Sequence, residues 1–276
     1  QQCHAELISV DSALVYRGLA IGAAQPDYPH HLIDIRDPLE VYTAADFVDG
    51  ALEAAEDVRA RGKVPIFVGG TMMYFKALLD GLSEMPASDP DVRAAIEKEA
   101  IEQGWPEMHR RLQVVDAITA EALHPNHSQR ISRALEVYRQ TGVPMSQWRE
   151  RSQGQKRAAI CVALAPAERR TLHERIEHRF DDMLANGFLE EVAALYQRGD
   201  LHVDLPAVRA VGYRQLWSHL SQEYSLEIAR EKGIAATRQL AKRQITWLRG
   251  WSGLHWLDSG AKNVQEQVKG QFRNYL

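Results

Sequence analysis

The sequence is poor in cysteine, lacks long apolar runs and has no large excess of charge of either sign. Its two cysteines, Cys3 and Cys161, lie far apart and form no CxxC motif, which excludes a disulfide framework and a cysteine-built zinc site. No apolar run approaches the roughly 20 residues that cross a bilayer, and the first ten residues lack the basic and hydrophobic regions of a signal peptide. We therefore expect a cytoplasmic protein without a membrane segment.

The net charge of −4 excludes a protein that coats nucleic acid indiscriminately, because binding to the phosphate backbone requires excess Lys and Arg. The charge is nevertheless unevenly distributed. Residues 233–256 contain no Asp or Glu, whereas Arg238, Lys242, Arg243 and Arg249 alternate with three tryptophans. This pattern predicts a local basic and aromatic patch that binds nucleic acid, with a solubilising helix face as the alternative.

Short apolar runs and helical patterns alternate along much of the chain. The runs at 6–10, 31–35, 64–70, 158–164 and 254–258 are typical of buried strands. Helical patterns follow Thr43, where Asp46 completes a capping box, and also follow Thr71 and Pro166. The alternation predicts an α/β protein with a parallel sheet.

Between residues 83 and 153 the strand pattern disappears and only helical patterns remain, with Asp89 and Ser128 as expected N-caps. We predict that this segment is a helical insertion into an α/β core formed by residues 1–82 and 154–276.

Polar residues that follow the predicted strands are the first candidates for chemistry, because ligands bind beyond the carboxyl ends of parallel strands. Asp11 and Ser12 follow one strand, and the GGT sequence at 69–71 follows another. Asp11 is suited to accept a proton from a bound amine, or to cap a turn. Thr71 and the glycines before it are suited to bind phosphate, or to cap a helix.

Two further groups of polar residues are each open to a ligand-binding interpretation and to a purely structural one. Arg175 and Arg179 share one face of a predicted helix, where they clamp pyrophosphate or form a solvated surface with neighbouring acids. Gln129, Arg130 and Arg133 form a polar helix turn that is able to read base edges or phosphates. The histidines have no spacing typical of metal ligands, so we expect no histidine metal site.

Seven segments resemble the tRNA dimethylallyltransferase (tRNA isopentenyltransferase) family. They follow one another in the family's order through nearly the whole chain, which makes the resemblance specific. They are ELISVDSALVYRGLAIGAAQP (6–26), PHHLIDIRDP (29–38), VGGTMMYFKALLDGL (68–82), HPNHSQRISRALEVYRQTG (124–142), RIEHRFDDMLANGFLEEV (175–192), LPAVRAVGYRQLW (205–217) and ATRQLAKRQITWLRGW (236–251).

The resemblance implies a P-loop kinase-like parallel-sheet core with a helical insertion that binds the anticodon arm of tRNA. It implies an enzyme that transfers the dimethylallyl group of dimethylallyl pyrophosphate to N6 of the adenine next to the anticodon and releases pyrophosphate. Mg²⁺ is the implied cofactor, and we expect a monomer. The sequence does not identify the metal ligands.

The resemblance also assigns site residues. Asp11 matches the family's general base, and Thr71 and Arg179 match the residues on the pyrophosphate side, so these three are the expected catalytic residues. The expected tRNA contacts are Asp11, Ser12, Ala13, Leu14, Thr71, Arg93, Gln129, Arg130, Ile131, Ser132, Arg133, Arg209, Ala210, Val211, Gly212, Tyr213, Arg214, Lys242, Arg243, Gln244, Ile245, Thr246, Trp247, Leu248 and Arg249.

The family's phosphate-binding loop, GPTASGKT, lies a dozen or so residues before its ELISVDS segment. No GxxxxGKS or GxxxxGKT sequence occurs in these 276 residues, and we expect the loop to lie outside them. Three other functions stay open: an isopentenyltransferase that acts on free adenylate, a small-molecule kinase with the same fold, and an inactive RNA-binding protein.

Overall fold

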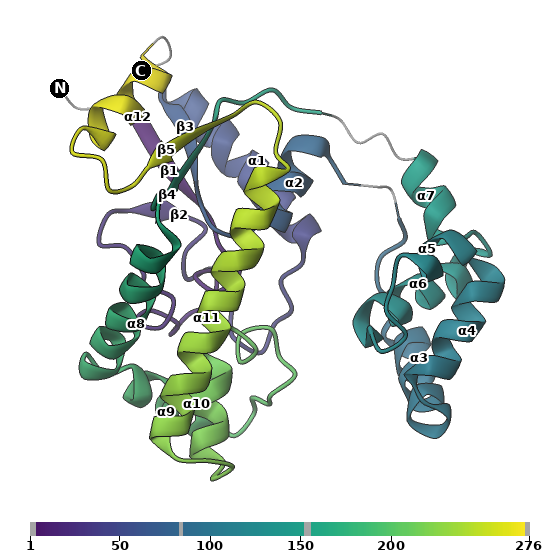
Figure 1. Ribbon diagram of the computed structural model, residues 1–276. Coiled ribbons are helices and arrows are strands. Elements are labelled where there is room, and N and C mark those ends of the chain that lie inside the picture. The colour runs from purple at the N-terminus through teal and green to yellow at the C-terminus, as the bar shows by residue number, and fades with distance from the viewer. Residues whose placement is uncertain (1–3, 83–84, 152–155, 274–276) are drawn as a thin grey trace. The chain divides into compact units, whose positions relative to one another are not determined.

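The computed structural model describes residues 4–82, 85–151 and 156–273 (Figure 1). The chain divides into two compact units. Gln1–Leu78 with Ala158–Leu276 form the first, here called the core unit, and Leu79–Arg157 form the second, here called the helical unit. The insertion expected at 83–153 falls inside the helical unit.

Among its described residues, the core unit contains five parallel strands in two small sheets. In the first sheet β1 (Ala5–Val10) lies between β2 (His30–His31) and β3 (Val64–Gly69), and in the second β4 (Cys161–Ala165) pairs with β5 (Leu254–Asp258). The predicted strands at 6–10, 64–70 and 254–258 are confirmed. The one predicted at 158–164 begins three residues later, at Cys161.

The strand predicted at 31–35 is wrong beyond His31. Leu32 and Asp34 have φ angles of 65° and 56°, which are incompatible with extended backbone. The amides of Asp34 and Ile35 instead donate to the carbonyl oxygens of Leu14 and Val15. This segment is therefore a turn that packs its backbone against the loop after β1.

The expectation that the strands are fully buried is also wrong for β3 and β4. The side chain of Val68 is 45% exposed and that of Leu164 is 55% exposed. Parallel sheets are usually covered on both faces. Because strand side chains point to the faces of a sheet, the described residues leave part of one face of β3 and of β4 uncovered.

Two helices follow strands of the first sheet as predicted. Helix α1 (Ala44–Ala60) begins with the expected capping box, in which Asp46 N donates to Thr43 Oγ1 at 3.2 Å and Thr43 N donates to Asp46 Oδ2 at 2.7 Å. Helix α2 (Met72–Asp80) follows β3. The rings of Phe47 and Tyr74 stack 4.5 Å apart and join the two helices in the main apolar core.

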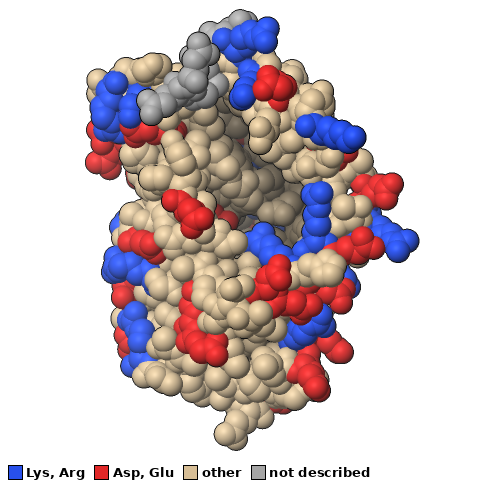
Figure 2. All heavy atoms as spheres, turned by 90° about the vertical axis from the view of Figure 1, so that its left-hand side faces the viewer, with Lys and Arg blue, Asp and Glu red and all other residues tan. Residues whose placement is uncertain are grey.

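The remaining helices of the core unit come from the C-terminal half of the chain. They are α8 (Arg169–Ala185), α9 (Phe188–Gln197), α10 (Tyr213–Leu220), α11 (Leu226–Arg249) and α12 (Val264–Phe272). Helices α8 and α9 lie at the left of Figure 1. Figure 2 shows that Lys and Arg mix with Asp and Glu on the face seen from that side, and that the upper half of this face is hollowed.

The helical unit has its own apolar core. Its helices are α3 (Pro90–Gln103), α4 (Trp105–Val115), α5 (Ala117–Glu121), α6 (Ser128–Thr141) and α7 (Met145–Arg151). Ile96, Met108, Leu112 and Ile131 are fully buried between them. Asp89 caps α3 as predicted, with its side chain accepting from Asp91 N and Val92 N. The N-cap of α6 is His127, one residue before the predicted Ser128.

Candidate functional site

The carboxyl ends of β1 and β3 meet at one point of the sheet. Val10 is paired with Gly69, and Thr71 N donates to the carbonyl oxygen of Val10 at 3.1 Å. A Cβ atom at Gly69 would lie 2.2 Å from that oxygen, so only glycine allows the strands to end this close together. The two strand ends bring Asp11 and Thr71 together.

Asp11 uses its two carboxylate oxygens differently. Oδ1 accepts from the amides of Ala13 and Leu14 at 2.7 and 3.1 Å, and this fixes the turn after β1. No described residue donates to Oδ2. Both interpretations of Asp11 therefore fit the same side chain, because one oxygen holds the turn and the other is available to a bound group.

Thr71 lies beside Ser12 and is only partly buried. Its Oγ1 accepts from Ser12 N at 3.1 Å and donates to Ser12 Oγ at 3.4 Å. Among the described residues, this hydroxyl bonds to the turn after β1 and not to the first turn of α2. Thr71 thus fixes the distance between the two strand-end loops and leaves a hydroxyl close to Asp11.

The loop that contains Thr71 also contacts the long helix α11. Gln244 Nε2 donates to the carbonyl oxygen of Gly70 at 2.9 Å. A Cβ atom at Gly70 would lie 2.5 Å from Gln244 Nε2, so the missing side chain makes room for this contact. Gln244 comes from the segment that the sequence predicts to contact tRNA.

Arg175 and Arg179 project from α8. Arg175 Nη1 donates to Ser259 Oγ at 3.2 Å, whereas Arg179 is exposed and forms no ion pair with any described residue. Two acids of α8 bind cations of α11, Glu177 to Arg230 and Arg238, and Asp181 to Arg230. The guanidinium group of Arg179 is therefore available to a ligand, whereas that of Arg175 is bonded to Ser259 of the same unit.

The C-terminal half of α11 carries the basic patch predicted from the sequence. Lys242, Arg243 and Arg249 are exposed, as is Trp247. Arg238, in contrast, is tied to Glu177 at 2.8 Å. The other predicted residues of this segment are less prominent: Thr246 is exposed, and Gln244, Ile245 and Leu248 are half-buried.

The predicted tRNA-contacting segment 209–214 contains a buried part. Arg209 and Arg214 are exposed and Ala210 and Val211 half-buried, but Gly212 and Tyr213 are buried. The Tyr213 hydroxyl donates to Glu191 Oε1 at 2.5 Å, and burial together with this carboxylate raises the pKa of Tyr213 above its ordinary value. The Tyr213 side chain supports the segment from inside and offers no surface to RNA.

The predicted contacts in the helical unit divide in the same way. Arg93, Gln129 and Arg130 are exposed and Arg133 is half-buried, whereas Ile131 and Ser132 face the interior. In the turn after β1, Ser12 is exposed, Ala13 half-buried and Leu14 buried. The exposed residues of each segment are the ones able to meet a ligand.

Two carboxylates that organise these segments were missed by the sequence reasoning. Glu191 accepts hydrogen bonds from the amides of Ala20, Ile21 and Gly22. Glu136 is fully buried beside Arg133. The spacing of three between Arg133 and Glu136 on a helix was the available signal, whereas no local pattern links Glu191 to a loop 169 residues earlier.

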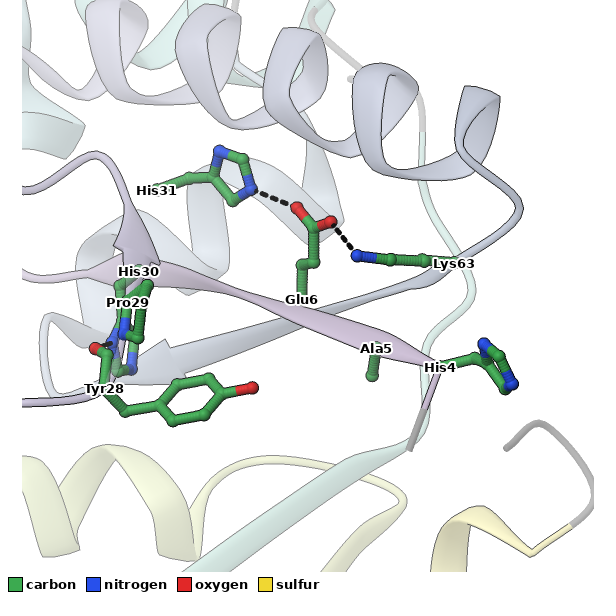
Figure 3. A pocket seen from close by; sticks show the side chains of 8 residues that line it. All are labelled: His4, Ala5, Glu6, Tyr28, Pro29, His30, His31 and Lys63. Atoms are coloured by element: carbon green, nitrogen blue, oxygen red, sulfur yellow. Dashed lines mark hydrogen bonds and ion pairs between the residues drawn. The ribbon is translucent and has the colours of Figure 1, made fainter. Parts of the chain in front are cut away.

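A hollow of about 550 Å³ lies at the amino end of β1, opposite the end that carries Asp11. Figure 3 shows Glu6 pointing toward His31 and Lys63 on one side of the strand, with Tyr28 and His30 on the other. Hydrogen bonds from Arg61, Lys63 and His31 hold the pKa of Glu6 well below its ordinary value. This cluster is separate from the strand-end site.

A family model and several solved structures are similar to this chain, and they agree with one another. A family model described as IPP transferase matches residues 14–251. The fold is similar to that of a full-length tRNA isopentenylpyrophosphate transferase from Bacillus halodurans, with 32% identity and a TM-score of 0.68 over 99% of this chain and 90% of that one. A tRNA delta(2)-isopentenylpyrophosphate transferase from Staphylococcus epidermidis has 30% identity and a TM-score of 0.67 over 100% and 92%.

A third similar structure is a eukaryotic dimethylallyltransferase acting on tRNA, with 26% identity and a TM-score of 0.79 over 98% of this chain and 72% of that one.

Within the described residues, no helix is both long and apolar enough to cross a membrane.

Proposed function

This chain belongs to the IPP transferase family, and from this premise we propose that it is a tRNA dimethylallyltransferase. It transfers the dimethylallyl group of dimethylallyl pyrophosphate to N6 of the adenine next to the anticodon and releases pyrophosphate. The observation that carries the proposal is the meeting of Asp11 and Thr71 at the ends of β1 and β3, with one oxygen of Asp11 free.

The reaction makes a demand that Asp11 is suited to meet. The lone pair of an adenine N6 is delocalised into the ring, so the amine becomes a good nucleophile only as it loses a proton. Asp11 Oδ2 accepts that proton while the bond from N6 to the allylic carbon forms. Oδ1 keeps the carboxylate in place through the amides of Ala13 and Leu14.

On the other side of the allylic carbon, the bond to the pyrophosphate oxygen breaks and the electron pair leaves with the pyrophosphate. The unpaired Arg179 guanidinium and the Thr71 hydroxyl, whose proton turns from Ser12 Oγ to the leaving group, stabilise the charge that grows on the pyrophosphate. Arg179 suits the role because it is exposed and forms no ion pair with any described residue.

The RNA contacts come from exposed residues of both units. In the core unit they are Arg209, Arg214, Lys242, Arg243 and Arg249, and in the helical unit they are Arg93, Gln129 and Arg130, with the half-buried Arg133 beside them. The adenine must leave its stack to reach Asp11, as bases of single-stranded RNA loops commonly do.

Mg²⁺ belongs to the proposal because the family implies it. Among the described residues, no group of three or more His, Cys, Asp or Glu side chains is arranged to hold a metal ion. These residues do not form a metal site by themselves, and we assign no step to the ion. A P-loop kinase-like core, a cytoplasmic location and a monomeric state complete the proposal, and the parallel pairing of all described strands supports the first of these.

The proposal is tested by incubating the protein with dimethylallyl pyrophosphate and either an anticodon stem-loop RNA or AMP. We expect one dimethylallyl group on the adenine of the stem-loop and none on AMP. Modified AMP would identify an adenylate isopentenyltransferase, and consumption of ATP with a small-molecule acceptor would identify a kinase. Binding of the stem-loop without transfer would identify an RNA-binding protein.

A further inference from the structure

Glu136 is a fully buried carboxylate in the helical unit. Its side chain on α6 has an exposed fraction of 0%. A buried carboxylate is costly unless charged or hydrogen-bonding partners surround it. The partners of Glu136 therefore indicate why the residue is tolerated in this interior.

The two oxygens of Glu136 bind two kinds of partner. Oε1 accepts from Ser88 Oγ and from Asp89 N, each at 2.7 Å. Oε2 lies 3.3 Å from Arg93 Nη2 and 3.1 Å from Arg133 Nη1. One oxygen fixes the start of α3, and the other binds one arginine from α3 and one from α6.

The two arginines reach from this buried anchor to the surface. The side chain of Arg93 is 44% exposed and that of Arg133 is 28% exposed. The two guanidinium groups share the Glu136 carboxylate, and Arg133 Nη2 also donates to the carbonyl oxygen of Pro86. Arg130 lies three residues before Arg133 on the same side of α6, which adds a third cation to this face.

We propose that Glu136 is a positioning residue for RNA binding, which holds Arg93 and Arg133 together in an orientation that receives phosphate groups. The inference rests on the proposed function, because it is the tRNA substrate that these arginines would meet. Glu136 makes no contact with RNA itself. It lowers the entropic cost of binding by fixing two long side chains in advance.

The charge state of Glu136 fits this role. Burial raises the pKa of the carboxyl, but the hydrogen bonds from Ser88, Asp89 N and Arg133 lower it more, so the pKa lies below its ordinary value. The anchor is thus ionised at neutral pH and attracts both arginines.

Glu99 provides a matched control in the same unit. Its carboxylate also binds two arginines, Arg111 at 2.6 Å and Arg139 at 2.8 Å. It is 30% exposed, and neither arginine belongs to a predicted tRNA-contacting segment. Removing its charge disrupts a comparable arginine pair without touching Arg93 or Arg133.

The experiment measures binding of an anticodon stem-loop RNA to the full chain over a range of salt concentrations. The variants are Glu136→Gln, Glu99→Gln, the double variant Arg93→Ala/Arg133→Ala, and the triple variant that adds Glu136→Gln to it. We expect Glu136→Gln to weaken binding about five- to tenfold and the arginine double variant to lower the log–log salt slope by about one to two. In the triple variant, Glu136→Gln should change affinity less than about twofold, and Glu99→Gln should bind like the wild type.

Three results would overturn the inference: a folded Glu136→Gln variant that binds normally, an equal loss from Glu136→Gln in the absence of both arginines, or normal binding by the arginine double variant. If Glu136→Gln does not fold, Glu136→Asp replaces it under the same criteria, since it keeps the charge but withdraws it from the arginines. A wild-type protein that fails to bind the stem-loop would overturn the proposed function itself and, with it, this inference.

Discussion

Gln244 on α11 donates a hydrogen bond of 2.9 Å to the carbonyl oxygen of Gly70, in the loop that leads to Thr71. The same helix carries Lys242 and Arg243, which are exposed. A residue of the segment predicted to contact tRNA therefore bonds directly to the loop at the candidate catalytic site.

Gln244→Ala should slow dimethylallyl transfer about fivefold, because a neutral hydrogen bond contributes about 1 kcal/mol net. Gly70→Ala should also slow it, since the new Cβ would lie 2.5 Å from Gln244 Nε2. In a Gln244→Ala background that clash is absent, and Gly70→Ala should then have little further effect. Single-turnover rates check this, with Gln239→Ala on the exposed side of α11 as the control. Independent losses from the two substitutions would show that the contact does not matter.

Asp11→Asn is the sharpest test of the general base. The asparagine retains an oxygen that accepts from the amides of Ala13 and Leu14, but it cannot take a proton from N6. We expect transfer to fall on the order of 10²–10⁴-fold, with RNA affinity and thermal stability close to those of the wild type. Asp11→Ala should lose the same activity and also some stability. Near-normal single-turnover rates in the asparagine variant would remove Asp11 from its assigned role.

Local patterns in the sequence were sufficient to predict much of the fold. The capping box at Thr43 and Asp46 and the strand at 254–258 were predicted from neighbours in the chain, and both were confirmed. The predicted strand at 31–35 failed because the backbone of Asp34 and Ile35 bonds to Leu14 and Val15. The strand propensity of a short segment carries no information on contacts with residues elsewhere in the chain.

The candidate site was predictable only in part for the same reason. Asp11 and Thr71 could be selected because they follow strands, and parallel strands bring their ends together. The contact of Gln244 with Gly70 joins residues 174 positions apart, and the burial of Tyr213 depends on the packing of a distant segment. Neither the contact nor the burial produces a periodic pattern in the sequence.

Arg179→Lys should rescue only part of the activity that Arg179→Ala loses. The guanidinium group is free of ion pairs with described residues, and its planar fork is suited to two pyrophosphate oxygens, whereas an ammonium group acts as a point charge. Transfer rates at increasing concentrations of dimethylallyl pyrophosphate measure the effect, which should include weaker use of the donor. Arg175→Lys serves as the control on the same helix face. Full activity of Arg179→Lys would show that the fork is not needed.

The stability that Glu136 contributes should depend on pH. Its pKa in the folded protein lies below the ordinary value of 4.5, so its ionised form is favoured by folding. The contribution is fully present above the unfolded value, near 4.5, and is lost as the pH falls through the lower folded value. Compared with Glu136→Gln, the wild type should gain about 1–3 kcal/mol at neutral pH, and the difference should shrink below pH 4.5. Hydrogen exchange of the α3 and α6 amides at several pH values measures it, and a constant difference across that range would contradict the assignment.

The exposed cations of α11 should determine how strongly RNA binding depends on salt. Lys242, Arg243 and Arg249 lie in a stretch without acids, and no described residue forms an ion pair with them. If each meets a phosphate, replacing all three by alanine should weaken binding of an anticodon stem-loop and lower the log–log salt slope by about one per lost contact. Use of dimethylallyl pyrophosphate should not change.

The alternative is a solubilising helix face, for which the charges are dispensable. Replacing the solvated Arg169, Arg170 and Lys262 in the same unit gives a variant of equal charge for comparison. Equal losses in the two triple variants would mean that net charge alone attracts the RNA, and unchanged binding in the α11 variant would leave RNA binding to the remaining exposed residues of the two units.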